Sequence, residues 1–463
     1  MTWKTDRTER ALRIAAVLAV SLFAAAPWPA GAQSLTDALA SAYTTNPTLQ
    51  AARAALRAVN EGVPQALSNW RPNVTVTGSA GGQTFKSDSG SFTNSDSSAP
   101  TGAAISVIQP LYRGGRTVAG TEAAENDVLA QRSALTSVEQ FVLLSAATAY
   151  MDVWRDLSVL DLNVNNEKVI KRQLEATQDR FAVGEVTRTD VAQSETRLAT
   201  ATAQRIAAEG TLSASKAVFQ QVIGIAPGFL RAPEPVTGLP KSVDEVVSLG
   251  TAQNPDILAA SYAEKAANYR VRQVVGELLP SLALTASASR NDNTTRNDTY
   301  SENAEVMAQL TVPIYQQGAV SSRVREAKQV SSQRRVEIEE QRRQIEQQAI
   351  SAWEALKTAR AQIKSLESGV HSAEIALEGV RQENLVGART ILDILDAEQE
   401  LLNAKVSLVR SQRDEVVTSF QVLSVVGRLT ASDLGLPVGV YDPDIDYRKV
   451  RNRWFGLDAP GAE

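Results

Sequence analysis

Two aspartates lie three residues apart near the start of a predicted helix, in residues 386–398 with the sequence VGARTILDILDAE. Because side chains at i and i+3 share a helix face, Asp393 and Asp396 project from the same side. Such a pair can act as general acid and base, bind a metal ion, cap the helix, or line a passage for cations. The other residues that each kind of site needs distinguish these four possibilities.

Catalysis and permanent metal binding both need partners that this sequence does not supply. The single histidine, His371, lies far along a predicted helix, where we expect a surface or seam residue. The sequence has no phosphate loop, nucleophile elbow or zinc cluster. Two carboxylates without histidine or cysteine make a poor transition-metal site. We therefore predict no catalytic residue, no cofactor and no metal site, and a protein that is not an enzyme.

The composition indicates an exported protein without disulfides. The chain has 463 residues, with 47 basic and 52 acidic side chains and a net charge of -5, so nucleic acid is not an expected partner. Residues 1–32 combine a basic region, an apolar region and a small-residue cleavage site, which predicts a signal peptide. The sequence contains no cysteine, which excludes a lipidated N-terminal cysteine. After the signal, no apolar run is long enough for a membrane helix.

The chain is predicted to contain two copies of one unit. Val183 and Gly184 reappear 203 residues later as Val386 and Gly387, and Asp190 reappears as Asp393. Such an offset indicates an internal duplication. We predict a first repeat over 33–224, a linker or equatorial segment over 225–243 and a second repeat over 244–427. A C-terminal equatorial segment and tail over 428–463 completes the chain, and it has little periodicity and is expected to be partly disordered past residue 442.

Each repeat is expected to contain a long helical hairpin, over 116–224 and 317–427. Both stretches lack proline, which costs roughly 3 kcal/mol inside a helix. Gly184 and Gly387 divide them, since glycine permits the left-handed conformation that ends a helix. The first arm of each hairpin would be about 65 residues, or roughly 100 Å long. Apolar residues at intervals of seven favour coiled-coil packing, as at Leu356, Ile363, Val370 and Leu377.

Each repeat also contains a helix followed by two amphipathic strands, at 72–82 and 102–112 and again at 280–290 and 304–315. Apolar and polar residues alternate along them for about ten residues, the length that a tilted strand needs to cross a bilayer. Polar loops over 83–101 and 291–303 would connect the strands. A soluble sheet with one wet face is the alternative, but it needs a core that no separate set of apolar helices supplies.

Four strands per chain are too few for a closed barrel, because about eight is the practical minimum. A sheet that faces lipid cannot leave its edges open. Strands from several chains must therefore combine, and three chains give twelve strands and twelve long helices. The predicted fold class is α+β: the strands of several chains would form one barrel in the membrane, and their long helices would form one tube below it.

The sequence resembles the TolC family of outer-membrane channels over essentially its whole mature length. The resemblance is carried by the duplicated order of elements and by two turn motifs, VGEVTRTDVAQSE and VGARTILDILDAE. It implies a homotrimer in the cell outer membrane with a large periplasmic part: a trimeric twelve-stranded outer-membrane β-barrel, continuous with a long periplasmic α-helical coiled-coil barrel. It also implies a periplasmic adaptor and an inner-membrane pump of the ABC or RND type as partners. The ending over 441–456 resembles the branch that serves type I protein secretion.

The turn motifs carry the candidate site. A structural interpretation assigns Thr189 with Asp190, and Thr390 with Asp393, to helix caps. It leaves Asp396 unexplained, because the first copy has Gln193 there. In a trimer whose second hairpin faces the threefold axis, Asp393 and Asp396 would form a ring of six carboxylates that selects cations. Crowded like charges would also raise some of their pKa values.

The resemblance implies further residue roles at the same place. It assigns Asp393 and Asp396 to the narrow periplasmic aperture. Arg389 matches an arginine that links this hairpin to a neighbour and keeps the aperture closed, with Thr189 and Asp190 at the acceptor positions. Asn384 stands where the family prototype has a gating tyrosine, so the closed state would lack that link or use a shorter hydrogen bond.

The function that these expectations favour is a passive outer-membrane export duct of a tripartite efflux pump or type I secretion system. The partners would set the cargo, so a protein, a drug, a metal ion or a dye would fit equally well. The alternative is a periplasmic coiled-coil adaptor or scaffold. An adaptor would normally carry one hairpin between small soluble β domains, which does not match two hairpins and four amphipathic strands.

Overall fold

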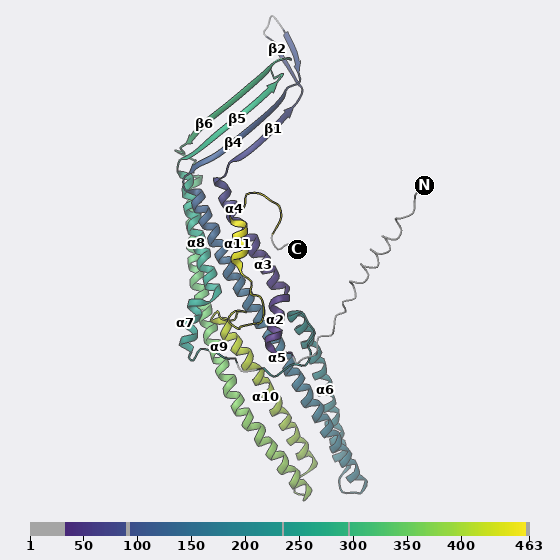
Figure 1. The fold of residues 1–463 in the computed structure, drawn as a ribbon. Coiled ribbons are helices and arrows are strands. Elements are labelled where there is room, and N and C mark those ends of the chain that lie inside the picture. Colours follow the sequence, from purple (N-terminus) through teal and green to yellow (C-terminus); the bar gives the residue numbers. More distant parts are fainter. Residues whose placement is uncertain (1–32, 89–92, 234–235, 295–296, 460–463) are drawn as a thin grey trace, which may run out of the picture.

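The computed structural model describes residues 33–88, 93–233, 236–294 and 297–459, and the predicted signal peptide lies outside these ranges. The molecule is elongated, with a β-sheet at one end and two helical hairpins that end side by side at the other (Figure 1). The described elements follow in this order: α2 (Leu35–Thr45), α3 (Pro47–Asn60), α4 (Gly62–Leu67), β1 (Asn73–Ala80), β2 (Gln83–Asp88), β3 (Thr93–Ser98), β4 (Thr101–Arg113), α5 (Arg116–Ala182), α6 (Arg188–Ile223), α7 (Val243–Gln253), α8 (Pro255–Val275), β5 (Ser281–Asp292), β6 (Tyr300–Thr311), α9 (Ala319–Leu385), α10 (Ile391–Val425) and α11 (Pro443–Arg451).

The main sheet is antiparallel, with the order β1-β4-β5-β6. Its register aligns residues of the same kind across all four strands. Because successive residues of a strand point to opposite faces, neighbouring rows belong to opposite faces. One row is apolar and the next is polar: Val74, Val107, Ala286 and Val306, then Thr75, Ser106, Ser287 and Glu305. The sheet therefore has one apolar and one polar face.

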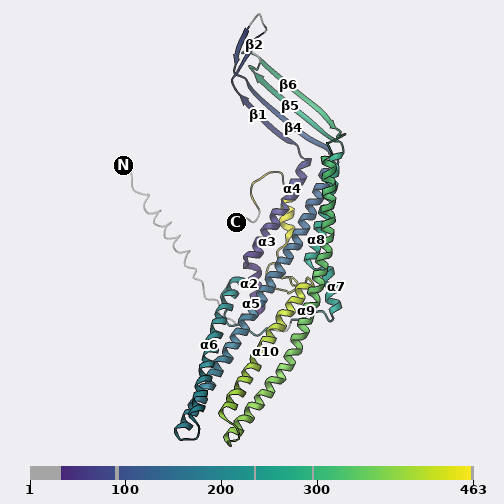
Figure 2. The ribbon, with the colours of Figure 1, turned by 180° about the vertical axis from the view of Figure 1, so that it is seen from behind.

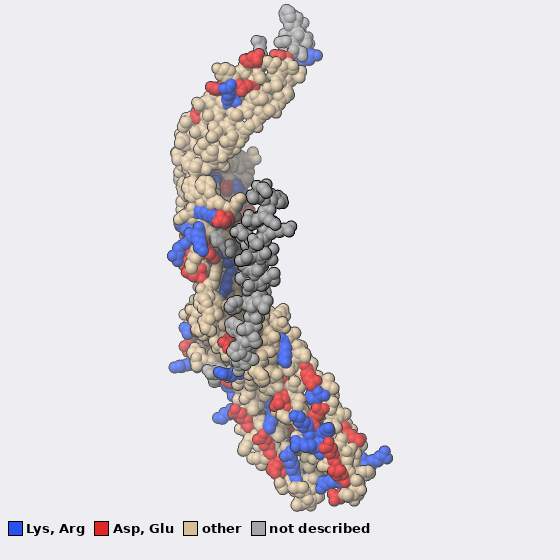
Figure 3. All heavy atoms as spheres, turned by 45° about the vertical axis from the view of Figure 1, so that its right-hand side comes forward, with Lys and Arg blue, Asp and Glu red and all other residues tan. Residues whose placement is uncertain are grey.

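The apolar face ends where charges begin. On that face, the row of Ile105, Ala288 and Ala304 is followed by a row that contains Arg290 and Glu302, which form an ion pair of 3.1 Å. Figure 3 shows the same division: the surface of the sheet is nearly free of charged side chains between its base and its far end. Lys, Arg, Asp and Glu cover the helical end instead.

The long helices have nearly the same dimensions in both halves of the chain. α5 and α9 each have 67 residues, and α6 and α10 have 36 and 35. At about 1.5 Å per residue, the longer arms extend roughly 100 Å. Seen from behind, α3 and α8 accompany them only on the half nearer the sheet, and α6 and α10 on the other half (Figure 2). Across the described ranges, no helix combines the length and the apolar character needed to cross a membrane.

The largest apolar core lies at the waist of the molecule, where α2 and α3 pack on α5. Tyr150 and Phe219 are fully buried there, and burial raises the pKa of Tyr150 to about 12. The same asparagine contact fixes the waist in both halves. Asn46 Nδ2 donates to the carbonyl of Val222 at 2.9 Å, and Asn254 Nδ2 donates to that of Val425 at 3.0 Å. Each asparagine also caps a helix that begins with proline.

The structure corrects the sequence-based expectations at three places. The stretch over 83–101 is not only a loop, because β2 and β3 form a separate hairpin there. β6 ends at Thr311 rather than near residue 315, and the proline that follows at 313 has no N–H to donate to a ladder. The expectation of a disordered tail is wrong for α11, which Asp442 caps and which packs on α3 and α4.

Candidate gate at the hairpin tips

Both hairpins turn through the same backbone structure. Gly184 and Gly387 have φ of +83° and +79°, a conformation that suits glycine. In each turn the glycine N–H donates to a carbonyl three residues back, and the next residue donates five residues back. This double hydrogen bond is the Schellman motif, which satisfies carbonyls at the helix end. The predicted roles of the two glycines at the turns match this geometry.

The helices after the turns begin with matching capping boxes. Asp190 Oδ2 accepts hydrogen bonds from the backbone N–H and the hydroxyl of Thr187, both at 2.8 Å. Asp393 Oδ2 accepts the same pair from Thr390 at the same distances. The cap interpretation of Asp190 and Asp393 is therefore confirmed, but the hydroxyl in the first turn belongs to Thr187 and not to Thr189. The offset of 203 from Thr390 was the signal that pointed to Thr187.

The capping hydrogen bonds favour the ionised form of the Asp393 carboxyl group. Its pKa is lowered because the carboxylate accepts from the backbone and the hydroxyl of Thr390, and Arg389 adds a smaller attraction. The rise expected from crowded carboxylates concerns several chains together and stays a prediction. The side chains of Asp393 and Asp396 are 37% and 57% exposed, whereas Ile394 and Leu395 are buried. Both carboxylates are therefore accessible to solvent.

Asp396 joins the two hairpins. Arg197 on α6 donates to its carboxylate and forms an ion pair with it. Just beside this pair, Ile391 and Leu395 of α10 pack with Ile170 and Ala201 of the first hairpin. An apolar cluster and an exposed ion pair therefore hold the tips of the two hairpins together.

Arg389 is bound within its own turn in this structure. Its Nε donates to Glu383 at 2.9 Å, and its Nη1 lies 4.0 Å from Asp393. Asn384 contacts both hairpins: its amide donates to the carbonyl of Arg389 at 2.8 Å, and its oxygen accepts from Arg180 at 3.4 Å. Thr189 and Asp190, the expected acceptors, are not partners of Arg389 within the chain.

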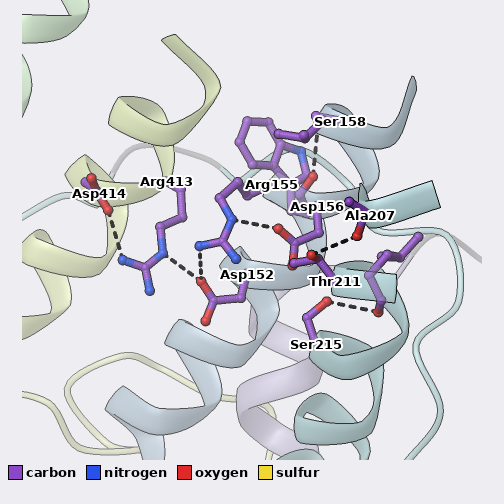
Figure 4. Close-up of polar contacts among 12 residues, drawn as sticks. Asp152, Arg155, Asp156, Ser158, Ala207, Thr211, Ser215, Arg413 and Asp414 are labelled. Carbon is purple, nitrogen blue, oxygen red and sulfur yellow. Dashed lines mark hydrogen bonds and ion pairs between the residues drawn. The ribbon is translucent and has the colours of Figure 1, made fainter. Parts of the chain in front are cut away.

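A second polar cluster joins the hairpins farther from the tips, and sequence analysis missed it. Asp152 of α5 accepts from Arg155 and from Arg413 of α10, both at 2.9 Å (Figure 4). Arg155 also binds Asp156, whose second oxygen is buried without a hydrogen-bond partner. A cavity of about 720 Å³ lies here between α5, α6 and α10. Only the relative placement of the helices brings Arg413 to this cluster, because it lies 261 residues from Asp152 in the sequence.

The partners Arg197 and Glu383 were also missed. The contact of Arg197 depends on how the two hairpins pack, whereas Glu383 lies six residues before Arg389 in the same turn. His371 is exposed, as expected for a surface position. Among the residues that the structure describes, no three His, Cys, Asp or Glu side chains gather closely enough to hold a metal ion.

Comparisons with known proteins agree with this architecture. The profile of the family described as "Outer membrane efflux protein" matches residues 38–224 and 246–428. The chain is 36% identical to outer membrane efflux protein BepC of Brucella suis, with 92% of both chains covered. It is 26% identical to outer membrane protein TolC of Escherichia coli, with 87% of this chain and 84% of the relative covered.

Among solved structures, the Campylobacter jejuni CmeC outer membrane channel superimposes with a TM-score of 0.76 at 18% sequence identity. The superposition covers 90% of this chain and 89% of that channel. At this identity the likeness concerns the fold alone.

Proposed function

Because this chain belongs to the outer membrane efflux protein family, we propose that three copies form one export duct that is gated at the hairpin tips. Family membership makes the chain a TolC-family channel of the outer membrane with a large periplasmic part. It also removes the alternative of a periplasmic adaptor, since the relatives are channels. What we propose beyond family membership is the trimer, the gate and the partners.

The four-stranded sheet carries the proposal. In the described chain, β1 and β6 each pair on one side only, and large apolar side chains of the apolar face, such as Val74, Val76 and Val306, are exposed. Open edges are not tolerated in lipid, because each unpaired N–H and C=O would cost several kcal/mol. Closing the sheet with copies of itself satisfies both edges, and three copies give twelve strands. The apolar face then meets lipid, and the polar face lines the lumen.

The helices continue the same wall. Each chain supplies the long arms α5 and α9 and the arms α6 and α10, so three chains would supply twelve. A passage of roughly 100 Å through the periplasm follows from the length of the arms. The chain needs no chemistry of its own for this task, and an inner-membrane pump of the ABC or RND type, coupled through a periplasmic adaptor, would supply the energy.

The gate would lie at the second hairpin. Three copies of Asp393 and Asp396 facing the threefold axis would form the aperture ring, and such a ring favours cations. Arg389 of one chain would reach Thr189 and Asp190 of the next and hold the aperture closed. Asp396 is half-exposed and Arg389 is bound only by exposed carboxylates, so both are available for contacts between chains.

Crosslinking of the sheet edges tests the assembly. The sequence contains no cysteine, so one cysteine on β1 and one on β6 introduce the only thiols. Pairs scanned along the apolar face, starting from Val76→Cys and Ala304→Cys, are expected to join three chains into one covalent species that migrates as a trimer after heating in detergent. Only monomers and dimers at every register would contradict the trimer.

A further inference from the structure

The last described segment presents three large apolar side chains to solvent. Trp454 and Phe455 are 58% and 87% exposed, and Leu457 is fully exposed. They follow α11 within four residues of each other, and the rings of Trp454 and Phe455 lie 6.3 Å apart. Side chains of this size are usually covered by something when they are grouped.

Residues 453–458 form a turn that is held by hydrogen bonds and an ion pair. Arg453 folds back over it, with Nε donating to the carbonyl of Phe455 at 2.9 Å and Nη1 donating to that of Asp458 at 2.8 Å. Its guanidinium also forms an ion pair with the Asp458 carboxylate. The polar groups of the turn therefore bond to one another, while its apolar side chains are exposed to solvent. The exposure of these side chains belongs to a defined structure.

The turn lies at the base of the sheet. Arg71, two residues before β1, donates to the carbonyl of Arg453 at 2.8 Å, and its guanidinium lies 4.7 Å from the centre of the Trp454 ring. Both ribbon views show the chain rising from α11 to just beneath the strands (Figures 1 and 2). Other exposed apolar side chains mark the same level at the ends of the strands: Trp70, Tyr112, Leu279 and Tyr315.

We propose that Trp454, Phe455 and Leu457 form an interfacial anchor that inserts into the periplasmic leaflet of the outer membrane. The inference rests on the proposed function, because it requires the sheet to span that membrane. Tryptophan suits the boundary between headgroups and acyl chains, and girdles of aromatic residues mark this boundary on membrane sheets. Phe455 and Leu457 then extend the girdle beyond the strands.

The charges beside the turn favour lipid over a second copy of the chain. Arg71 lies against the indole, and Arg448 and Lys449 are exposed at the end of α11. Cations placed next to exposed aromatic and aliphatic side chains fit anionic phosphate groups above an apolar layer. The anchor would attach the C-terminal segment to the membrane surface and restrain the waist of the duct through α11.

Fluorescence quenching in vesicles tests the anchor in the full chain. Phe455→Cys is labelled with a thiol-reactive fluorophore and reconstituted into vesicles of phosphatidylethanolamine and phosphatidylglycerol that carry a nitroxide lipid. Val306→Cys on the apolar face of the sheet is the control for lipid contact. Gly379→Cys, in an exposed and open part of α9 near the tips, is the control for water.

Quenching of the label at 455 within about twofold of that at 306, with little at 379, is the expected result. Quenching at 306 but not at 455 overturns the anchor and leaves the proposed function intact. No quenching at 306 overturns the proposed function itself. A label at 455 that is shielded from both the nitroxide lipid and aqueous iodide lies against protein, which assigns the turn to a second copy and also overturns the anchor.

Discussion

The two hairpin turns share a backbone and differ in their charges. Both use a glycine with positive φ, a Schellman motif and a Thr–Asp capping box with equal distances. Where the first turn has Arg180 paired with Glu185, the second has Glu383 paired with Arg389. Where the second has Asp396, the first has Gln193.

This difference separates architecture from candidate function. The glycine, the Schellman motif and the capping box, which both turns contain, let the chain reverse between two antiparallel helices. Asp396 and Arg389 occur only in the second turn, and the first turn forms its double hydrogen bond and its capping box without them. The carboxylate binds across to Arg197 of the first hairpin, and the guanidinium binds exposed acids. We therefore propose that the gate lies at the second turn and that the first turn is a fixed support.

The largest expected effect comes from removing the second turn's carboxylates. Asp393→Asn with Asp396→Asn is expected to weaken block of the channel by a trivalent cation about tenfold, or roughly 1.4 kcal/mol. The loss of negative charge at a constriction is the cause. Block is measured in a planar bilayer, with Asp190→Asn in the first turn as the matched control. Equal weakening by the control would place the ring elsewhere.

The next effect concerns the closed state. Arg389→Ala is expected to raise resting conductance about fivefold, because losing about 1 kcal/mol of linkage shifts a closed–open equilibrium by that factor. Val186→Ala, at the equivalent position of the first turn, is expected to leave it low. Glu383→Gln removes only the partner within the chain and is also expected to leave conductance low. An unchanged conductance in Arg389→Ala removes this residue from the gate.

The two capping threonines are expected to stabilise their helices equally. Thr187→Ala and Thr390→Ala each remove a capping hydroxyl, at a cost of about 1 kcal/mol to the first turn of α6 or α10. Hydrogen exchange of the amides of Asp190 and Asp393 measures this cost as about fivefold faster exchange. A tenfold disparity between the two variants would show that equal geometry does not give equal stability here.

The smallest effect is a pH dependence at the second cap. The folded pKa of Asp393 lies below its usual value, so the stabilisation is complete above the usual pKa and is lost as pH falls through the folded value. Protection of the Asp393 amide, corrected for intrinsic exchange, is expected to stay constant at neutral pH and decline only below about pH 4. Asp393→Asn is the control and loses this decline. A decline that begins near neutral pH would contradict the lowered pKa.

Sequence patterns predicted the elements best where one rule acted over a long stretch. The absence of proline located α5 and α9, which both end next to the predicted glycines. Alternation located β4 and β5 within two residues of their expected ends. The two turn motifs carried the family resemblance, which the family match confirms.

Other features depended on weaker or longer-range signals. β3 has the sequence TNSDSS, in which only the first residue is β-branched and apolar and polar residues do not alternate. Its pairing with β2 was not expected. α11 is polar, yet Asp442 before Pro443 was a helix-start signal that could have located it. Arg197 lies 199 residues from Asp396, so no spacing rule links them, and the contact follows only from the packing of the tips.

One measurement tests most directly whether the second turn, and not the first, surrounds the aperture. Single cysteines are placed at the equivalent positions, Asp396→Cys and Gln193→Cys, in a chain that otherwise has none. Conductance is recorded before and after a bulky thiol reagent, and crosslinking between chains is followed on a gel after oxidation. We expect closure and crosslinked chains for position 396 and neither for position 193. Equal behaviour at both positions, or an effect at 193 alone, would contradict it.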